Sequence, residues 1–368
     1  MKVWILIFVC MFSMPLLVAV LHFRMRKGQI LKIRQDYVKN ARYFGRSFSA
    51  LVEKALPEMK NGMIMLSRQE KVLETDGKQE FVQPEIEDLI IARNTIFCPQ
   101  QEDLHFQKEI YSEKDALFVK ENIRLRAVYS KKRLLFGNKI RLLRWADAEH
   151  AVAVYDECDL GERVSSGEQL VIGFDNIFHS LYAPVIRLGQ RPEELDRFME
   201  ERDPRIFRMP VMNRYEYNRH YIDDDMVTES GTVPYTIISR GDIKVIEDII
   251  LQGDIHSDGA VRIMENASVL GNIFAENDIL LEKNATVLGN IFTQGNIIFE
   301  EDASAGQPDK IISVVARGTI TFYGGNYVYG YVVSEGGGKI LKSDREVLGE
   351  YCNGVQREHN KKLNNGLP

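Results

Sequence analysis

The residues of this chain that could do acid–base or metal chemistry are few and scattered. Of seven histidines, His150, His179 and His256 lie next to apolar or glycine-containing stretches, where a histidine in a cleft could act as a general base. The acidic run Asp223–Asp225 could bind a divalent cation. None of them has a motif partner, so exposed histidines and a solvated acidic loop explain them more simply. The sequence therefore predicts no catalytic, cofactor-binding or metal-binding residue.

Other motifs and the composition argue against several classes of function. The chain contains no P-loop, dinucleotide fingerprint, CxxC pair or nucleophile elbow, and its net charge of −6 argues against nucleic acid as a partner. Four cysteines without close pairing fit a reducing compartment. Two glycosylation sequons begin at Asn266 and Asn284, but their spacing indicates a structural repeat rather than modification.

The repeat is the most informative pattern in the sequence. The hexapeptide Val-Leu-Gly-Asn-Ile-Phe occurs at 269–274 and again at 287–292. A repeat this short predicts stretches that fold alike and stack on one another. Reading every sixth residue gives eleven apolar positions in succession, which we expect to face inward. They are Ile243, Ile249, Ile255, Val261, Ala267, Ile273, Ile279, Ala285, Ile291, Ile297 and Ala303.

Six residues suit one short strand and one corner, so three strands make a coil of 18 residues. The sequence thus predicts an all-β fold, a parallel β-helix whose triangular coils stack about 4.8 Å apart. A glycine followed by Asp or Asn precedes many inward positions, and we expect these glycines at left-handed corners. The predicted corner glycines are Gly241, Gly253, Gly271, Gly289 and Gly295.

On these residues the chain resembles the bactofilins, a family of polymer-forming cytoskeletal proteins of bacteria. The resemblance rests on Gly-Asp-Ile-His-Ser-Asp-Gly at 253–259, the 18-residue spacing and the Gly-Asn-Ile repeats. It is clear over about residues 238–303 and weaker to 333. It implies a right-handed β-helix without enzymatic activity that polymerises end to end without nucleotide, often at the membrane. The chain departs from the family in length, since about 150 ordered-looking residues precede the clear repeats.

The remaining sequence divides into segments of different character. Residues 85–189 carry strand-length apolar runs, and the 17-residue spacings of Ile123 to Ile140 and Phe118 to Leu135 favour an irregular β-solenoid. A small β-sandwich is the alternative. We expect a loop and short-helix insertion at 190–236, the bactofilin-like β-helix at 237–335 with a coil insertion at Ser304–Lys310, and a polar tail at 336–368.

The N-terminus predicts a membrane anchor over residues 1–23. Val3–Leu21 contains no charge and is long enough to cross a hydrocarbon core of about 30 Å, whereas a signal peptide needs a shorter apolar run and a small-residue cleavage site. The positive-inside rule places the C-terminal side in the bacterial cytoplasm. The basic residues of the flank, which would also attract anionic head groups, are Arg24, Arg26, Lys27, Lys32 and Arg34.

An amphipathic helix is expected within residues 24–57, ending before Pro57. We expect its apolar face to pack on the solenoid and to cap the open end; a self-associating coiled-coil stalk is the alternative. The residues of this face are Ile30, Ile33, Tyr37, Ala41, Phe44, Phe48, Leu51 and Ala55.

Together these patterns predict a non-enzymatic scaffold at the cytoplasmic membrane. The protein would self-associate through the ends of its β-helix and position protein partners that the sequence does not identify. Two alternatives stay open. One is a solenoid-type enzyme, an acyltransferase or carbohydrate-active protein, with a cleft at His256 or Asp223–Asp225. The other is an extracytoplasmic envelope protein, if the membrane orientation is reversed.

Overall fold

The computed structural model describes residues 40–75, 80–190, 231–308 and 310–342, the backbone of 219–222 and 226–227, and the single residues Met14 and Pro192. Within these residues no helix is long and apolar enough to cross a membrane. Apart from Met14, the predicted anchor lies outside the described residues, as do its basic flank and Asp223–Asp225. One compact unit begins at Phe44 and contains every strand.

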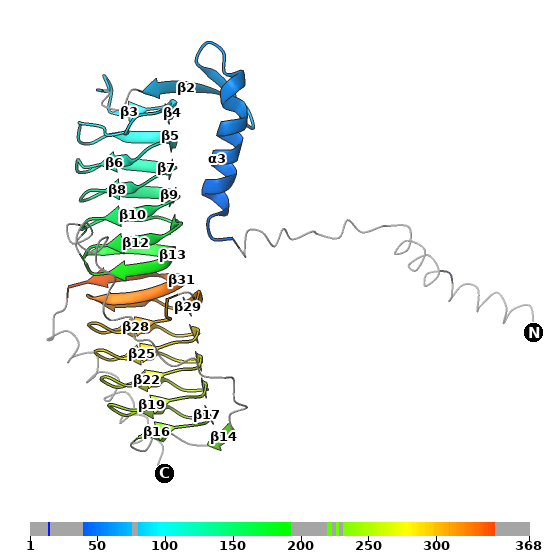
Figure 1. Cartoon of the computed structure of the whole chain (residues 1–368), viewed down its shortest axis with the longest axis vertical. Coiled ribbons are helices and arrows are strands. Elements are labelled where there is room, and N and C mark those ends of the chain that lie inside the picture. Colours follow the sequence, from blue (N-terminus) through cyan, green and yellow to red (C-terminus); the bar gives the residue numbers. More distant parts are fainter. Residues whose placement is uncertain are drawn as a thin grey trace, which may run out of the picture. The chain divides into compact units, whose positions relative to one another are not determined.

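The fold is all-β, a β-solenoid of about 13 turns preceded by one helix (Figure 1). The helix α3 (Tyr43–Ala55) continues into the 3-10 turn η1 (Leu56–Glu58). The first strands are β1 (Met63–Met65), β2 (Gln69–Thr75), β3 (Glu85–Ile86), β4 (Leu89–Ala92), β5 (His105–Ser112), β6 (Ala116–Phe118), β7 (Arg124–Ser130), β8 (Leu134–Phe136), β9 (Arg141–Ala148), β10 (Ala151–Val154), β11 (Arg163–Ser166), β12 (Gln169–Ile172) and β13 (Asn176–Leu188). We call β2–β13 the N-lobe.

The second group of strands, β14–β31, forms a second stack of coils, which we call the C-lobe. Its strands are β14 (Arg219–Ile222), β15 (Met226–Val227), β16 (Thr232–Val233), β17 (Thr236–Ser239), β18 (Ile243–Val245), β19 (Ile250–Leu251), β20 (Ile255–Ser257), β21 (Val261–Ile263), β22 (Ser268–Val269), β23 (Ile273–Ala275), β24 (Ile279–Leu281), β25 (Thr286–Val287), β26 (Ile291–Thr293), β27 (Ile297–Phe299), β28 (Ser304–Ala305), β29 (Ile312–Ala316), β30 (Ile320–Tyr323) and β31 (Asn326–Leu341).

The C-lobe has the 18-residue coil that the sequence predicts. Its parallel strands form three files, and in the regular coils from β16 to β28 a residue pairs with the residue 18 positions on, as Ile255 does with Ile273 and Ile273 with Ile291. All eleven inward positions predicted from the six-residue period are buried, each with at most 2% of its surface exposed. Strands β18 to β28 are only two or three residues long because a corner must follow within six residues.

The N-lobe is a solenoid of the same coil length, as predicted for 85–189, and is not a β-sandwich. Ile110 pairs with Val128, Val128 with Ala146, and Ala146 with Val164, each 18 residues apart. The lobe starts earlier than expected, because β2 already pairs in parallel with β4. The 17-residue spacing of Phe118 and Leu135 is one short of the coil, since Phe118 pairs with Phe136.

The corners work differently from the sequence expectation. The predicted corner glycines do not have positive φ; left-handed backbone recurs instead at Asp248, Asn266, Asn284 and Asp302, with φ of 57° to 59°. The glycines serve close approach between coils. A Cβ at Gly271 would overlap the backbone of Gly253, and one at Gly289 would overlap Gly271. Both sequon asparagines are therefore corner residues of consecutive coils.

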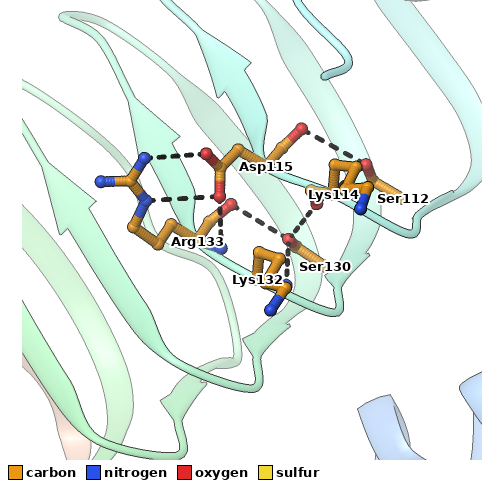
Figure 2. Close-up of polar contacts among 6 residues, drawn as sticks. All are labelled: Ser112, Lys114, Asp115, Ser130, Lys132 and Arg133. Carbon is orange, nitrogen blue, oxygen red and sulfur yellow. Dashed lines mark hydrogen bonds and ion pairs between the residues drawn. The ribbon is translucent and has the colours of Figure 1, made fainter. Parts of the chain in front are cut away.

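Polar side chains at the corners form ladders along the stack. The Asn272 side chain accepts from the backbone N–H of Asn290 at 2.8 Å, and Asp254 accepts from that of Asn272 at 2.7 Å. An N-lobe corner uses Asp115, which accepts from the backbone N–H and the guanidinium of Arg133 (Figure 2). Burial alone would raise the pKa of Asp115, but these hydrogen bonds and the positive charge hold it below its usual value.

The last coil departs from the expected boundaries. The coil insertion is present, since Ile291 pairs with Val314, 23 residues on, although Ser304 and Ala305 still belong to β28. Strand β31 runs to Leu341, so the glycine run at 336–338 lies inside it and not in a tail that begins at residue 336. At the other end, β14 already pairs with β17, so the C-lobe begins at Arg219 within the predicted insertion.

We expect Ile273→Asp to destabilise the C-lobe by about 4 kcal/mol or more, because it buries an unpaired charge. The matched control is Ile250→Asp, the same substitution at an outward position that is 39% exposed. This control should change stability by only about 0.5 kcal/mol. Urea denaturation of the full chain, followed by far-UV circular dichroism, measures both. Equal effects of the two substitutions would contradict the inward assignment.

Candidate interaction surfaces

The two lobes join through an antiparallel strand pair. β13 is the last strand of the N-lobe and β31 the last of the C-lobe, and they pair from Asn176 opposite Ile340 to Leu188 opposite Asn326, with two irregularities. The coils of the two lobes therefore advance toward each other along the chain, which Figure 1 shows as two stacks meeting at β13 and β31. Each lobe uses the edge of its last coil to pair with the other.

Aromatic side chains and glycines fill this junction. The rings of Tyr182 and Tyr331 lie opposite each other with centroids 4.6 Å apart. Phe178 is buried beside Phe322, at 6.3 Å between centroids, and any Cβ at Gly338 would overlap its ring. No local sequence pattern marks these residues, because a glycine that makes room for a ring looks like a glycine in a tail.

The first coil of the C-lobe has unpaired edges within the described part of the chain. β14, β15 and β16 pair on one side with β17, β18 and β19, and no described strand pairs with their other side. In β16, the Val233 carbonyl accepts from the backbone N–H of Gln252 at 2.9 Å, so Val233 points its backbone groups to the next coil. Because these groups alternate along a strand, those of Thr232 point to the open edge.

Helix α3 covers one side of the N-lobe. Phe48 packs edge-on against Tyr111 and Trp145, with centroids 6.4 and 5.6 Å away, and Val52 is fully buried. A Cβ at Gly45 would overlap the buried Asp147 side chain, which explains a glycine inside the helix. The helix therefore packs as predicted but spans several coils rather than capping an end.

The register of α3 differs from the prediction at two positions, Phe44 and Leu51. Phe44 is 39% exposed, with the Arg163 guanidinium over its ring at 5.6 Å. Leu51 was expected on the packed face, but it is 52% exposed, and Val52 lies there instead. Ile30, Ile33 and Tyr37 lie outside the described residues.

A polar contact fixes the helix at Glu53. Its carboxylate lies 2.9 Å from the ammonium of Lys131 and accepts from the hydroxyls of Ser49 at 3.0 Å and Tyr111 at 3.3 Å. The Lys131 hydrogen bond is the main reason that the pKa of Glu53 lies below its usual value. Burial raises the pKa of Tyr111, so this phenol stays a donor.

One outward column of the C-lobe is apolar except for one histidine. Its successive members on neighbouring coils are Ile238, His256, Phe274, Phe292 and Val315. Phe274 and Phe292 are 39% and 38% exposed, and the His256 ring stacks on Phe274 at 4.9 Å. His256 is therefore a mid-strand residue of β20 and not a corner residue.

The other histidines named from the sequence do not converge. His150 lies in the N-lobe, where its Nδ1 is 2.6 Å from a carboxylate oxygen of Glu168. His179 lies in β13, near Gly337. No group of three or more His, Cys, Asp or Glu side chains that could hold a metal ion occurs among the described residues. In comparisons with protein-family models, curated proteins and solved structures, the chain gave no match.

We expect Gly338→Val to loosen the lobe junction, because the added side chain must displace the buried Phe178 ring. Overpacking of this kind costs about 1–3 kcal/mol. Lys339→Val is the matched control, since Lys339 is exposed on the same strand. Hydrogen exchange of the full chain should show faster exchange in β13 and β31 for Gly338→Val alone. Unchanged protection of both strands would show that the junction does not depend on this packing.

Acid should weaken the docking of α3. Because the folded pKa of Glu53 lies below the unfolded one, its contribution is complete above about pH 4.3. It is lost as pH falls through the lower folded value. In a Trp4→Phe background, the fluorescence of Trp145, which contacts Phe48, should report the loss. Adding Glu53→Gln should weaken docking at neutral pH and reduce the fluorescence change on acidification. An equal fluorescence change with and without Glu53 would show that this carboxylate does not control the docking of α3.

Proposed function

We propose that this protein is a bactofilin-like structural scaffold, with right-handed triangular coils, that self-associates through the ends of its solenoid. The β13–β31 junction is the observation that carries this proposal. It joins two β-helical stacks end to end within one chain through main-chain hydrogen bonds and aromatic packing. An end of such a stack is therefore a surface on which another end can dock.

The first coil of the C-lobe supports the same proposal. Unpaired strand edges are templates for pairing with another chain, and proteins that stay monomeric usually cover them. A second copy could place its own β14–β16 against this end in a two-fold, self-complementary contact. The junction of β13 and β31 is used within each chain, so a two-fold contact at this end joins two copies into a pair.

The sequence of residues 1–34 supports a place at the membrane. An uncharged stretch followed by five basic residues suits a single span with the solenoid on the cytoplasmic side. The scaffold would then organise protein partners along the inner membrane of a bacterial cell.

Thr232→Pro should weaken self-association of the full chain at least tenfold. Proline removes an N–H that points to the open edge and blocks strand pairing there, while the bonds to the next coil are kept. Sedimentation velocity over a concentration series measures association, and thermal unfolding of the same variant controls for damage to the fold. A wild-type protein that stays monomeric at the highest concentration would refute the proposal.

Two reporters fused after Pro368 test the orientation. Green fluorescent protein, which is fluorescent in the cytoplasm, should be fluorescent in the fusion, and alkaline phosphatase, which is inactive there, should be inactive. Deleting residues 1–23 should move the protein from the membrane fraction to the soluble fraction. The reverse reporter pattern would support an extracytoplasmic envelope protein instead.

A further inference from the structure

A groove of about 510 Å³ lies on the side of the N-lobe and crosses five coils. One wall is a single column of outward side chains. Its members are Glu85, His105, Arg124, Arg141 and Asp159, each in register with the next. Neighbouring members are therefore about 4.8 Å apart along the stack. The groove has the length of an extended chain rather than of a compact small molecule.

The order of charges along this column is acidic, basic, acidic. Glu85 lies at one end and Asp159 at the other, and two guanidinium groups are adjacent between them. Like charges opposite each other on neighbouring strands are destabilising. Elsewhere in the lobe arginines face carboxylates of the preceding coil, as Arg126 faces Glu109 at 3.2 Å and Arg133 faces Asp115 at 2.9 Å.

Arg124 breaks that pattern. Its side chain is exposed and makes no hydrogen bond or ion pair with the residues that the structure describes. Its neighbour Arg141 has Asp159 only at 4.0 Å, the limit of an ion pair. Two adjacent guanidinium groups with so few carboxylate partners within the protein are suited to bind an anion from outside. In proteins, a guanidinium group binds a carboxylate through two parallel hydrogen bonds.

The opposite wall carries a second, independent sign of function. It consists of Asp103, Asn122, Lys139 and Glu157, which have left-handed backbone with φ of 56° to 60°. Every other non-glycine residue with positive φ in the described chain is Asn or Asp, the types that tolerate this conformation. The two exceptions, Lys139 and Glu157, both line the groove. Strained residues kept against local preference are typical of binding sites.

The walls together give an acidic–basic–acidic trough. Asp103 and Glu85 lie toward one end, the two arginines in the middle, and Glu157 and Asp159 toward the other end. Lys139 also lies in the middle, but its ammonium pairs with Glu121 at 3.0 Å, so the positive charge open to a ligand is that of Arg124 and Arg141. Along the stack, the centre of the arginine pair is one and a half coils, or about 7 Å, from Asp103 on one side and from Glu157 and Asp159 on the other. Glu85 lies one coil beyond Asp103. A polyanion such as nucleic acid would be repelled at both ends. The complementary ligand carries one negative charge between two positive charges.

We propose that this groove binds an extended peptide segment of a partner protein with the charge pattern Lys/Arg-x-Asp/Glu-x-Lys/Arg. In an extended chain, residues i−2, i and i+2 face the same side and lie about 6.6 Å apart, which matches the spacing of charges in the groove. The acidic side chain pairs with Arg124 and Arg141, and the basic side chains pair with the carboxylates at the two ends. The scaffold thereby acquires a docking site on its side that is separate from the ends used for self-association.

The test uses the full chain and a fluorescein-labelled, blocked peptide Ala-Lys-Ala-Glu-Ala-Lys-Ala, with fluorescence anisotropy at low salt. The control peptide Ala-Lys-Lys-Ala-Ala-Glu-Ala has the same composition in another order. We expect at least tenfold tighter binding of the first peptide, and a loss of at least tenfold in the double variant Arg124→Gln/Arg141→Gln. Arg126→Gln, which removes an arginine that faces Glu109, should bind like the wild type.

Three results would overturn the proposal. These are equal binding of the two peptides, no binding of either, and an equal loss in Arg126→Gln. A uronic-acid oligosaccharide that binds through the same two arginines while the peptide does not would replace it with a glycan site. The Thr232→Pro protein should keep peptide binding, so failure of the self-association proposal and failure of this one can be told apart.

Discussion

The backbone hydrogen bond from one coil to the next is the interaction on which the rest of this structure depends. It fixes an 18-residue register, as between Ile255 and Ile273, and therefore stacks like side chains on like. Inward columns become continuous apolar files and outward columns become ladders, in which an amide such as Asn290 bonds to its equivalent Asn272. Each coil has backbone groups on both edges, so it needs a neighbouring coil on each side to pair them all. At the two ends of a stack, the outer edge of the last coil has no such neighbour, and its backbone groups must be paired in another way.

The chain resolves two of its ends by joining them to each other. A parallel continuation from N-lobe to C-lobe would have needed only a short connection after β13. Instead the chain leaves Leu188, starts the second stack at Arg219, and returns to pair β31 antiparallel to β13. Antiparallel pairing satisfies the edge groups of both last coils at once, at the cost of two register irregularities. The first coils of the two lobes differ. In the N-lobe, β1 pairs antiparallel to β2, whereas in the C-lobe no strand of the described residues pairs with the outer edge of β14–β16.

Sequence periodicity predicted the parts that repeat and missed the parts that occur once. The six-residue period located the inward residues, because burial recurs at every coil. The glycines predicted at left-handed corners instead allow close approach between coils. A glycine needed for close approach and one needed for positive φ look alike in a sequence. The junction, the exposed Leu51 and the groove depend on contacts between distant segments that no local pattern encodes. A glycine run at 336–338 was the one available signal for the junction.

A regular solenoid makes its functional positions visible as departures from its own rules. At left-handed corners the rule is Asn or Asp, because their short polar side chains tolerate αL backbone and can bond locally. Lys139 and Glu157 lack such short side chains. Their φ values of 57° and 60° show that the backbone is nevertheless left-handed at both residues. The corner itself would be more stable with Asn, so the longer side chains at these positions are explained by what they reach. The Lys139 ammonium lies 3.0 Å from the Glu121 carboxylate, and Glu157 lines the groove. Both residues line the same groove, next to an exposed arginine pair, and this shared location supports the proposed binding site.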